Sequence, residues 1–307
     1  MKIIELSYDH LPNQLKPCFL YLVSLRKDSA ITIYELKFLW HAEGLVEPTK
    51  MKSVEEVMDF YLDTLISSSL VILFNDIGYY STCLLYDLLH DVCLIKAREE
   101  KLFELISSSA TSSSSDLSSR QMTINYHREH FGINFVLIDT KSKRHSGKHL
   151  YSLMITGDEL DDYLSDICHL RHLRLLRVFI LESSFIMVKD SLLNEIFMLV
   201  HLRFLNFETE VKALPSSFSN FFNLETLIVE NKGPPLVLLP RIWTLLKLRV
   251  LSIKAGSLFD FDVDEPILTT KDTRLRELEI FRETRVHLLK RHRGYFQKVS
   301  QSSTTFI

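Results

Sequence analysis

Apolar residues in the first hundred positions recur at intervals of three and four residues, a spacing that is typical of amphipathic helices. Gly44 and Ser53 mark boundaries, as a stop signal and a candidate N-cap. Two bulky runs on either side of a polar turn at 75–78 predict a β-hairpin, and a last helix is expected over 86–98. This order of elements predicts a winged-helix domain over residues 1–106. The three helical faces before the hairpin are Leu15, Phe19, Leu20 and Val23; Ile33, Leu36, Leu39 and Trp40; and Val54, Val57, Met58, Tyr61, Leu62 and Leu65.

A different template governs the chain after its first 149 residues. An apolar residue is followed after two spacers by a second and after one more spacer by a third. Six units fit: Leu150/Leu153/Ile155, Leu176/Phe179/Leu181, Leu202/Leu205/Phe207, Leu224/Leu227/Val229, Leu248/Leu251/Ile253 and Leu275/Leu278/Ile280. Their spacing falls in the period of leucine-rich repeats, whose units must stack to bury their leucines. We predict a leucine-rich-repeat solenoid over 150–281, an irregular tail over 282–307, and a mixed α/β chain.

The segment between the two patterns is polar. Residues 107–119 read SSSATSSSSDLSS, and residues 140–149 form a second polar stretch that is rich in Lys, Arg and His. Neither stretch has an apolar period or enough bulk to bury itself. We therefore expect a linker over 107–149.

Composition narrows the class of protein. The formal net charge is −3, which does not favour nucleic acid as the main partner, because duplex binding rests on many Lys and Arg contacts to phosphates. The cysteines Cys18, Cys83, Cys93 and Cys168 form no CxxC pair, so free core thiols in a reducing compartment are expected. No apolar run is long enough to cross a membrane. We expect a cytoplasmic protein, with peripheral membrane association left open.

Several motifs resemble plant nucleotide-binding, leucine-rich-repeat immune receptors. The stretch 6–46, LSYDHLPNQLKPCFLYLVSLRKDSAITIYELKFLWHAEGLV, is similar to the winged-helix end of their nucleotide-binding module. LYDLLHDVC at 85–93 resembles their Met-His-Asp motif, and SKRHSGKHLYSL resembles the solanaceous late-blight-resistance branch. The resemblance implies a C-terminal fragment of an intracellular receptor. Such a receptor acts in plant defence and the hypersensitive response through protein–protein contacts and an ADP/ATP-state switch.

The resemblance also implies which residues would meet a nucleotide. In the family motif a His and an Asp lie on bound ADP, and Tyr86 and Asp87 occupy those places here. Asp87 keeps the family residue, whereas the Tyr86 phenol cannot reproduce the hydrogen bonds of an imidazole. The sequence has no GxxxxGK[ST] loop for phosphates, so we expect no cofactor in this fragment and no enzyme activity. ADP or ATP would belong to the full-length receptor, whose nucleotide-binding and coiled-coil domains are the implied intramolecular partners.

A row of residues on the strands is the candidate interaction surface. The third and fifth positions of each unit are expected to point to the concave face of the solenoid, away from the leucines. A contiguous apolar patch in such a place usually marks a partner surface. We expect it to dock the nucleotide-binding domain, a pathogen effector or a host protein, unless the linker or a loop covers it. On this basis Phe204→Asp should disrupt docking and leave the fold intact. The row comprises Met154, Val178, Ile180, Phe204, Asn206, Ile228 and Val250.

Other chemistries have weaker support. Cys168, His169 and His172 lack a fourth ligand at suitable spacing, so no metal site is predicted. No nucleophile or oxyanion loop accompanies the acidic and His residues of the last predicted helix, so no catalytic residue is predicted. The alternative function is a winged-helix DNA-binding protein with a repeat interaction domain. The predicted recognition helix at 33–42 offers Lys37 against Glu35, which makes DNA the second choice.

Overall fold

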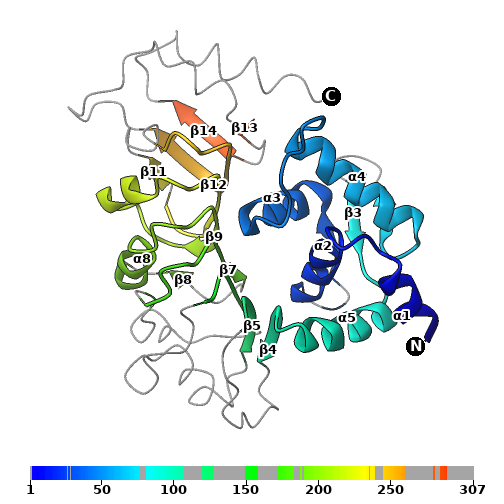
Figure 1. Cartoon of the computed structure of the whole chain (residues 1–307). Coiled ribbons are helices and arrows are strands. Elements are labelled where there is room, and N and C mark those ends of the chain that lie inside the picture. The colour runs from blue at the N-terminus through cyan, green and yellow to red at the C-terminus, as the bar shows by residue number, and fades with distance from the viewer. Residues whose placement is uncertain are drawn as a thin grey trace.

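The computed structural model describes residues 2–25, 27, 29–75, 81–106, 119–126, 149–157, 170, 172–182, 187–188, 190–234, 236–238, 245–259, 279–280 and 284–288. A helix-rich domain lies on one side of a long parallel sheet (Figure 1). Helix α3 packs on the sheet against strands β7 and β9, and the turn η1 packs against β4 and β5.

The helix-rich domain has the predicted order of elements. Its helices are α1 (Lys2–Asp9), α2 (Lys16–Tyr21) with the 3₁₀ turn η1 (Leu22–Ser24), α3 (Ile33–Glu43), α4 (Val54–Ser67) and α5 (Asp87–Glu99). The strands β1 (Ile31–Thr32), β2 (Ile72–Asn75) and β3 (Ser81–Leu84) form an antiparallel sheet in the order β1-β3-β2. The predicted winged helix near the N-terminus is therefore confirmed, with β2 and β3 as the hairpin.

Local sequence signals set the ends of its helices. The Thr32 hydroxyl caps α3 by accepting a hydrogen bond from Glu35 N, and α3 ends at Gly44, whose φ of 76° is left-handed. Ser53 and Glu56 form a reciprocal capping box at the start of α4. These caps satisfy backbone groups that a helix end would otherwise leave without partners.

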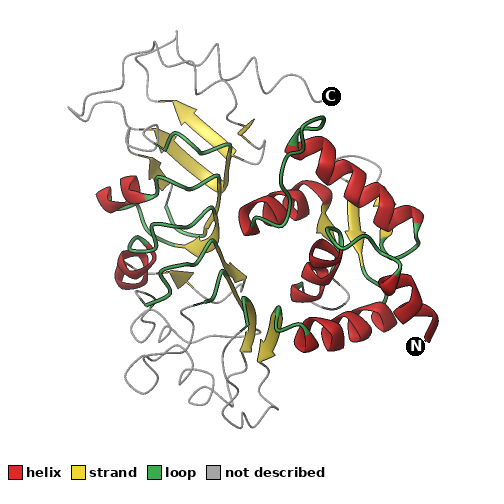
Figure 2. Ribbon diagram, viewed as in Figure 1, coloured by secondary structure: helices red, strands yellow, loops and turns green. Residues whose placement is uncertain are grey.

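The second part is a parallel sheet. Its main strands are β4 (Phe103–Ile106), β5 (Gln121–Tyr126), β6 (Ser152–Gly157), β7 (Val178–Glu182), β9 (Phe204–Thr209), β10 (Thr226–Asn231) and β12 (Val250–Phe259). They lie side by side in this order (Figure 2). Shorter elements are β8 (Met187–Val188), α8 (Asp190–Ile196), the 3₁₀ helix η3 (Ser216–Asn220), β11 (Leu236–Leu238), β13 (Glu279–Ile280) and β14 (Thr284–Leu288).

The register of the sheet follows the predicted template. The middle apolar positions Leu153, Phe179, Leu205, Leu227 and Leu251 are paired from strand to strand. The sixth unit differs, because β13 pairs Leu251 with Ile280 rather than with the template position two residues earlier. That shift keeps the same face of the strand.

Two predicted boundaries are wrong. Strand β5 lies inside the expected linker 107–149 and joins β4 to β6 in the sheet. The template does not predict β5 because Ser119 occupies the position of the leading leucine. Met122 and Ile124, at the second and third template positions, are buried in the core. The tail expected to be irregular begins with β14, which pairs with β12.

The apolar core is divided between the two faces of the sheet. One cluster collects the predicted leucines together with α8 and η3, on the side away from the winged helix. The other cluster combines the core of the winged helix with side chains from the opposite face of β6, β7 and β9. The second cluster is the candidate functional site.

Candidate functional site

The predicted concave row faces the winged helix and is not exposed. Val178 and Phe204 are 0% exposed, and Met154, Ile180 and Val250 are also buried. Asn206 and Ile228 are half-buried, and Ile228 packs against the shared cluster. The expected exposure of the five buried residues is wrong. Four of them, all except Val250, belong to the cluster that the strands share with the chain's own winged helix, which covers this face. Whether any of these residues also docks another protein stays a prediction.

Polar contacts surround the shared apolar cluster. Arg177, Glu225 and Arg249 each stand one residue before a strand, and each meets the winged helix. Arg177 Nη1 donates to the Glu43 backbone oxygen at 2.8 Å, and Arg249 Nη2 donates to Glu55 Oε1 at 2.8 Å. His41 Nδ1 lies 3.6 Å from Glu225 Oε2.

These contacts form a charged border along α3 and α4. The sequence carried a signal for it, since charged residues recur at the position just before the strands, as at Arg177, Arg203, Glu225 and Arg249. The charged border could not be predicted from the sequence, because the period of the strands does not show which domain lies opposite these charges.

The most buried charged group of the interface is Glu43, the last residue of α3. Its side chain is 4% exposed, and the carboxyl oxygen Oε1 has no hydrogen-bond partner in the described part of the chain. Burial raises the pKa of this carboxyl from 4.5 to about 7, while Ser152, Arg177 and Gln121 act in the opposite direction. The carboxyl therefore stays protonated well above the pH at which an exposed glutamate ionises.

Gly44 explains how Arg177 approaches so closely. A Cβ built on Gly44 would lie 2.9 Å from Arg177 Nη1, closer than real Cβ atoms come to a neighbour. Gly44 also adopts the left-handed conformation that ends α3. Gly44 therefore both ends the helix and leaves room for the Arg177 guanidinium.

The residues predicted to meet a nucleotide lie elsewhere, at the start of α5. Tyr86 is its N-cap residue and is 52% exposed, and Asp87 is its first residue and is also exposed. An aspartate in the first turn suits the positive end of a helix dipole. The contact of Asp87 with a nucleotide stays a prediction.

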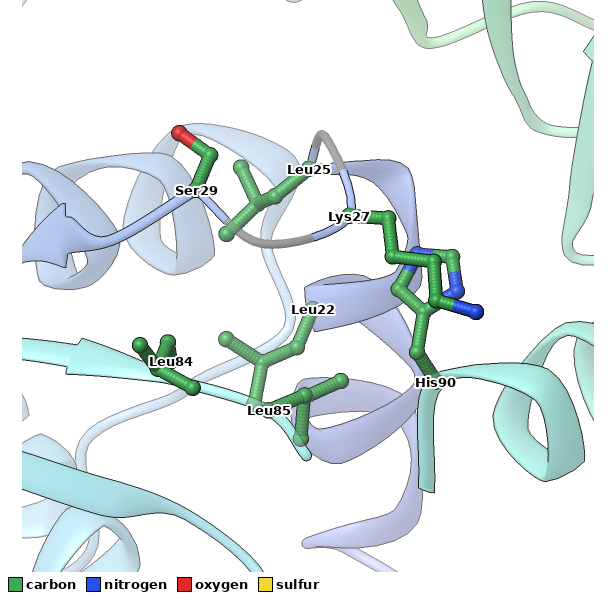
Figure 3. A pocket seen from close by; sticks show the side chains of 7 residues that line it. All are labelled: Leu22, Leu25, Lys27, Ser29, Leu84, Leu85 and His90. Atoms are coloured by element: carbon green, nitrogen blue, oxygen red, sulfur yellow. The ribbon is translucent and has the colours of Figure 1, made fainter. Parts of the chain in front are cut away.

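A small pocket lies beside the start of α5 (Figure 3). Its lining residues are Leu22, Leu25, Lys27, Ser29, Leu84, Leu85 and His90. Lys27 Nζ is 3.2 Å from Asp91 Oδ1. Tyr86 and Asp87 do not line this pocket. Both ring nitrogens of the buried His90 lack hydrogen-bond partners among the described residues.

Comparison with known proteins identifies the family. Residues 26–93 match the "Disease resistance protein Winged helix domain". The chain is 31% identical over 260 residues to "Putative late blight resistance protein homolog R1B-16" of Solanum demissum, covering 82% of this chain and 19% of the relative. It is 33% identical over 229 residues to "Disease resistance protein RPP8" of Arabidopsis thaliana, covering 71% of this chain and 24% of the relative.

The chain belongs to the plant disease resistance proteins. The family predicted from the motifs, including its likeness to late blight resistance proteins, is confirmed. The chain spans about a fifth to a quarter of the length of these relatives.

The described cysteines of this disease resistance protein are part of its core. Cys18, Cys83 and Cys93 are free and buried as predicted, whereas Cys168 and His169 lie outside the described residues. Burial raises the pKa of Cys83 to about 11 and that of Cys93 to about 12. Such thiols stay protonated and fill the core instead of acting as nucleophiles. Among the described helices, none combines the length and hydropathy that crossing a membrane requires.

Proposed function

We propose that the chain is the winged-helix and leucine-rich-repeat part of an intracellular plant immune receptor. One observation carries the proposal: a winged helix of the disease-resistance type packs on a parallel sheet in which the successive strands β6, β7, β9, β10 and β12 begin 22–26 residues apart. That interval and the row of paired leucines are typical of leucine-rich repeats. Such a chain acts by binding and not by catalysis.

Nucleotide-state switching is part of the proposal. Asp87 is exposed at the positive end of α5, where a carboxylate can meet a docked nucleotide-binding domain and its ADP or ATP. The partners are that domain and a coiled-coil domain in the full receptor, and a pathogen effector or host protein at the repeats. We place the receptor in the cytoplasm, with peripheral contact to membranes.

The alternative function, reading of DNA through α3, has less support. That helix packs against β7 and β9, so its inner face is occupied by the sheet. Lys37, the basic residue of the helix, is paired with Asp59 on α4. A helix held in this way has little free surface for a DNA groove.

A receptor chimera tests the proposal. The chain replaces the matching segment of the Solanum demissum relative, and Asp87→Ala is compared with Asp63→Ala, an exposed carboxylate on α4. We expect Asp87→Ala to lower the amount of ADP that copurifies and to raise cell death in leaves, whereas Asp63→Ala should change neither. Tyr86→His should act in the direction opposite to Asp87→Ala. Equal nucleotide retention in all variants would contradict the role of Asp87.

A further inference from the structure

One ionisable side chain lies inside the contact between the winged helix and the sheet. Glu43 ends α3, and its carboxyl is buried where α3, α2 and the first strands of the parallel sheet meet. Most other contacts across this face are apolar, and the remaining charged pairs, such as Arg249 with Glu55, lie at its half-exposed border. Glu43 is thus the one glutamate among the described buried residues.

The surroundings of Glu43 are mostly neutral. Gln121 of β5 and Ser152 of β6 approach the carboxyl from the sheet, and Tyr21 approaches it from α2. Burial, and then the nearby Glu43, raises the pKa of Tyr21 well above 10, so the phenol stays neutral. Glu35 of α3 acts electrostatically on the same phenol and adds a second negative charge near this corner.

Arg177 is the positive group that faces this corner, and it does not bond to the carboxylate. Its Nη1 donates to the Glu43 backbone oxygen, with the guanidinium stacked 4.5 Å from the centre of the Tyr151 ring. Close packing on Gly44 fixes this position. An ionised Glu43 is therefore compensated only in part while the two domains are in contact.

We propose that Glu43 is a proton-controlled latch, which holds the winged helix on the sheet while its carboxyl is protonated and loosens the contact when it ionises. The proton passes to solvent on ionisation. Separation of the domains then exposes the carboxylate to water, where its charge is no longer penalised. The latch requires only this chain's residues and is independent of any nucleotide.

The direction of the pH effect follows from linkage. The docked state binds the Glu43 proton more tightly than the open state, so the docked state holds more protons at intermediate pH. Docking is then strongest below about pH 4.5 and weakens as the pH rises to about 7. Each pH unit inside this window weakens docking by up to about tenfold, and the effect levels off above it.

The two faces of the sheet provide a matched pair of reporters. Met154 is buried between the sheet and the winged helix, whereas Met122 is buried on the opposite, leucine-lined face. Hydroxyl-radical footprinting of the full chain, read by mass spectrometry, gives the ratio of Met154 to Met122 oxidation. Opening of the interface raises this ratio, whereas global unfolding raises both rates.

His41 also faces Glu225 across this interface, so a His41→Gln background isolates Glu43. In that background we expect the oxidation ratio to rise severalfold between pH 5 and pH 8. Glu43→Gln should keep the ratio low and flat, and Glu47→Gln, an exposed carboxylate nearby, should behave like the background.

Two results would overturn the latch. One is a Met154 to Met122 oxidation ratio that does not change with pH in the His41→Gln protein. This measurement needs no Glu43 variant, so it tests the latch even if Glu43→Gln fails to fold. The other is a folded Glu43→Gln protein whose ratio still rises with pH, because the titrating group would then be a different one. Far-UV circular dichroism and low Met122 oxidation verify that each variant is folded.

Discussion

The two faces of the same strands are buried by different means. On β9, Phe204 and Leu205 are neighbours in sequence and both are 0% exposed, yet they belong to different clusters. Leu205 packs among residues supplied by the neighbouring units. Phe204 packs in the cluster that contains Trp40 and Leu39 of α3. One core lies within the part of the chain that forms the parallel sheet, and the other joins that part to the winged helix.

This difference predicts separate consequences for equally buried side chains. Loss of a side chain from the leucine-lined face weakens the sheet itself. Loss from the shared face removes contacts of both domains at once and releases the winged helix. Stability measurements alone would not separate these cases, so a reporter inside the interface is needed.

The largest expected effect is that of Phe204→Asp. The change removes a buried aromatic ring and leaves a charge without a partner, so the free energy of unfolding should fall by at least about 4 kcal/mol. Fluorescence of Trp40, in a Trp243→Phe background, should shift to the red under native conditions as the interface opens. This replaces the expectation from sequence that the fold would tolerate the substitution.

Leu205→Ala is the matched control for Phe204→Asp. It should cost about 2–5 kcal/mol, with Trp40 still in its native environment at low denaturant. Phe222→Asp is the second control, because that ring is 66% exposed. A native Trp40 spectrum in Phe204→Asp would mean that the shared core does not hold the domains together.

Much of the fold was predictable because its signals are local. Ser53 and Gly44 mark helix ends through hydrogen bonds and backbone conformation within a few residues. The paired leucines of the sheet follow from a period that is visible in one dimension. Strand β5 was missed because a single changed position, Ser119, interrupts the template.

The candidate site was only half predictable for a physical reason. Alternation along a strand assigns Phe204 and Val178 to the face opposite the leucines, and that assignment is correct. It cannot say what covers the face, because covering depends on contacts between residues more than a hundred positions apart, such as Arg177 and Glu43. The role of Glu43 was hidden for the same reason, since an AEG sequence does not reveal a buried carboxyl.

A smaller effect is expected at the end of α3. Gly44→Ala forces a side chain into the left-handed conformation, at a cost of roughly 1–2 kcal/mol, and places a Cβ against Arg177. Urea unfolding should show this loss, and Met154 oxidation should rise because the arginine is displaced. In an Arg177→Ala background the clash is gone, so Gly44→Ala should cost less there. An equal cost in both backgrounds would show that Arg177 has no part in the effect.

The smallest effect is expected at the border of the interface, with Arg249→Ala. Arg249 and Glu55 are both about half exposed, and such pairs contribute roughly 0.2–1 kcal/mol. Arg249 lowers the pKa of Glu55, so the stabilisation by this pair is present at neutral pH and is lost as the pH falls through that lowered pKa. The sign is opposite to that of Glu43, whose contribution is lost as the pH rises.

A double-mutant cycle of Arg249→Ala and Glu55→Ala, measured at neutral and acidic pH and at low and high salt, isolates the pair. We expect a small coupling energy that disappears in acid and in salt. A coupling well above about 1 kcal/mol would mean that the charged border, and not the buried cluster around Phe204, is what holds the winged helix on the sheet.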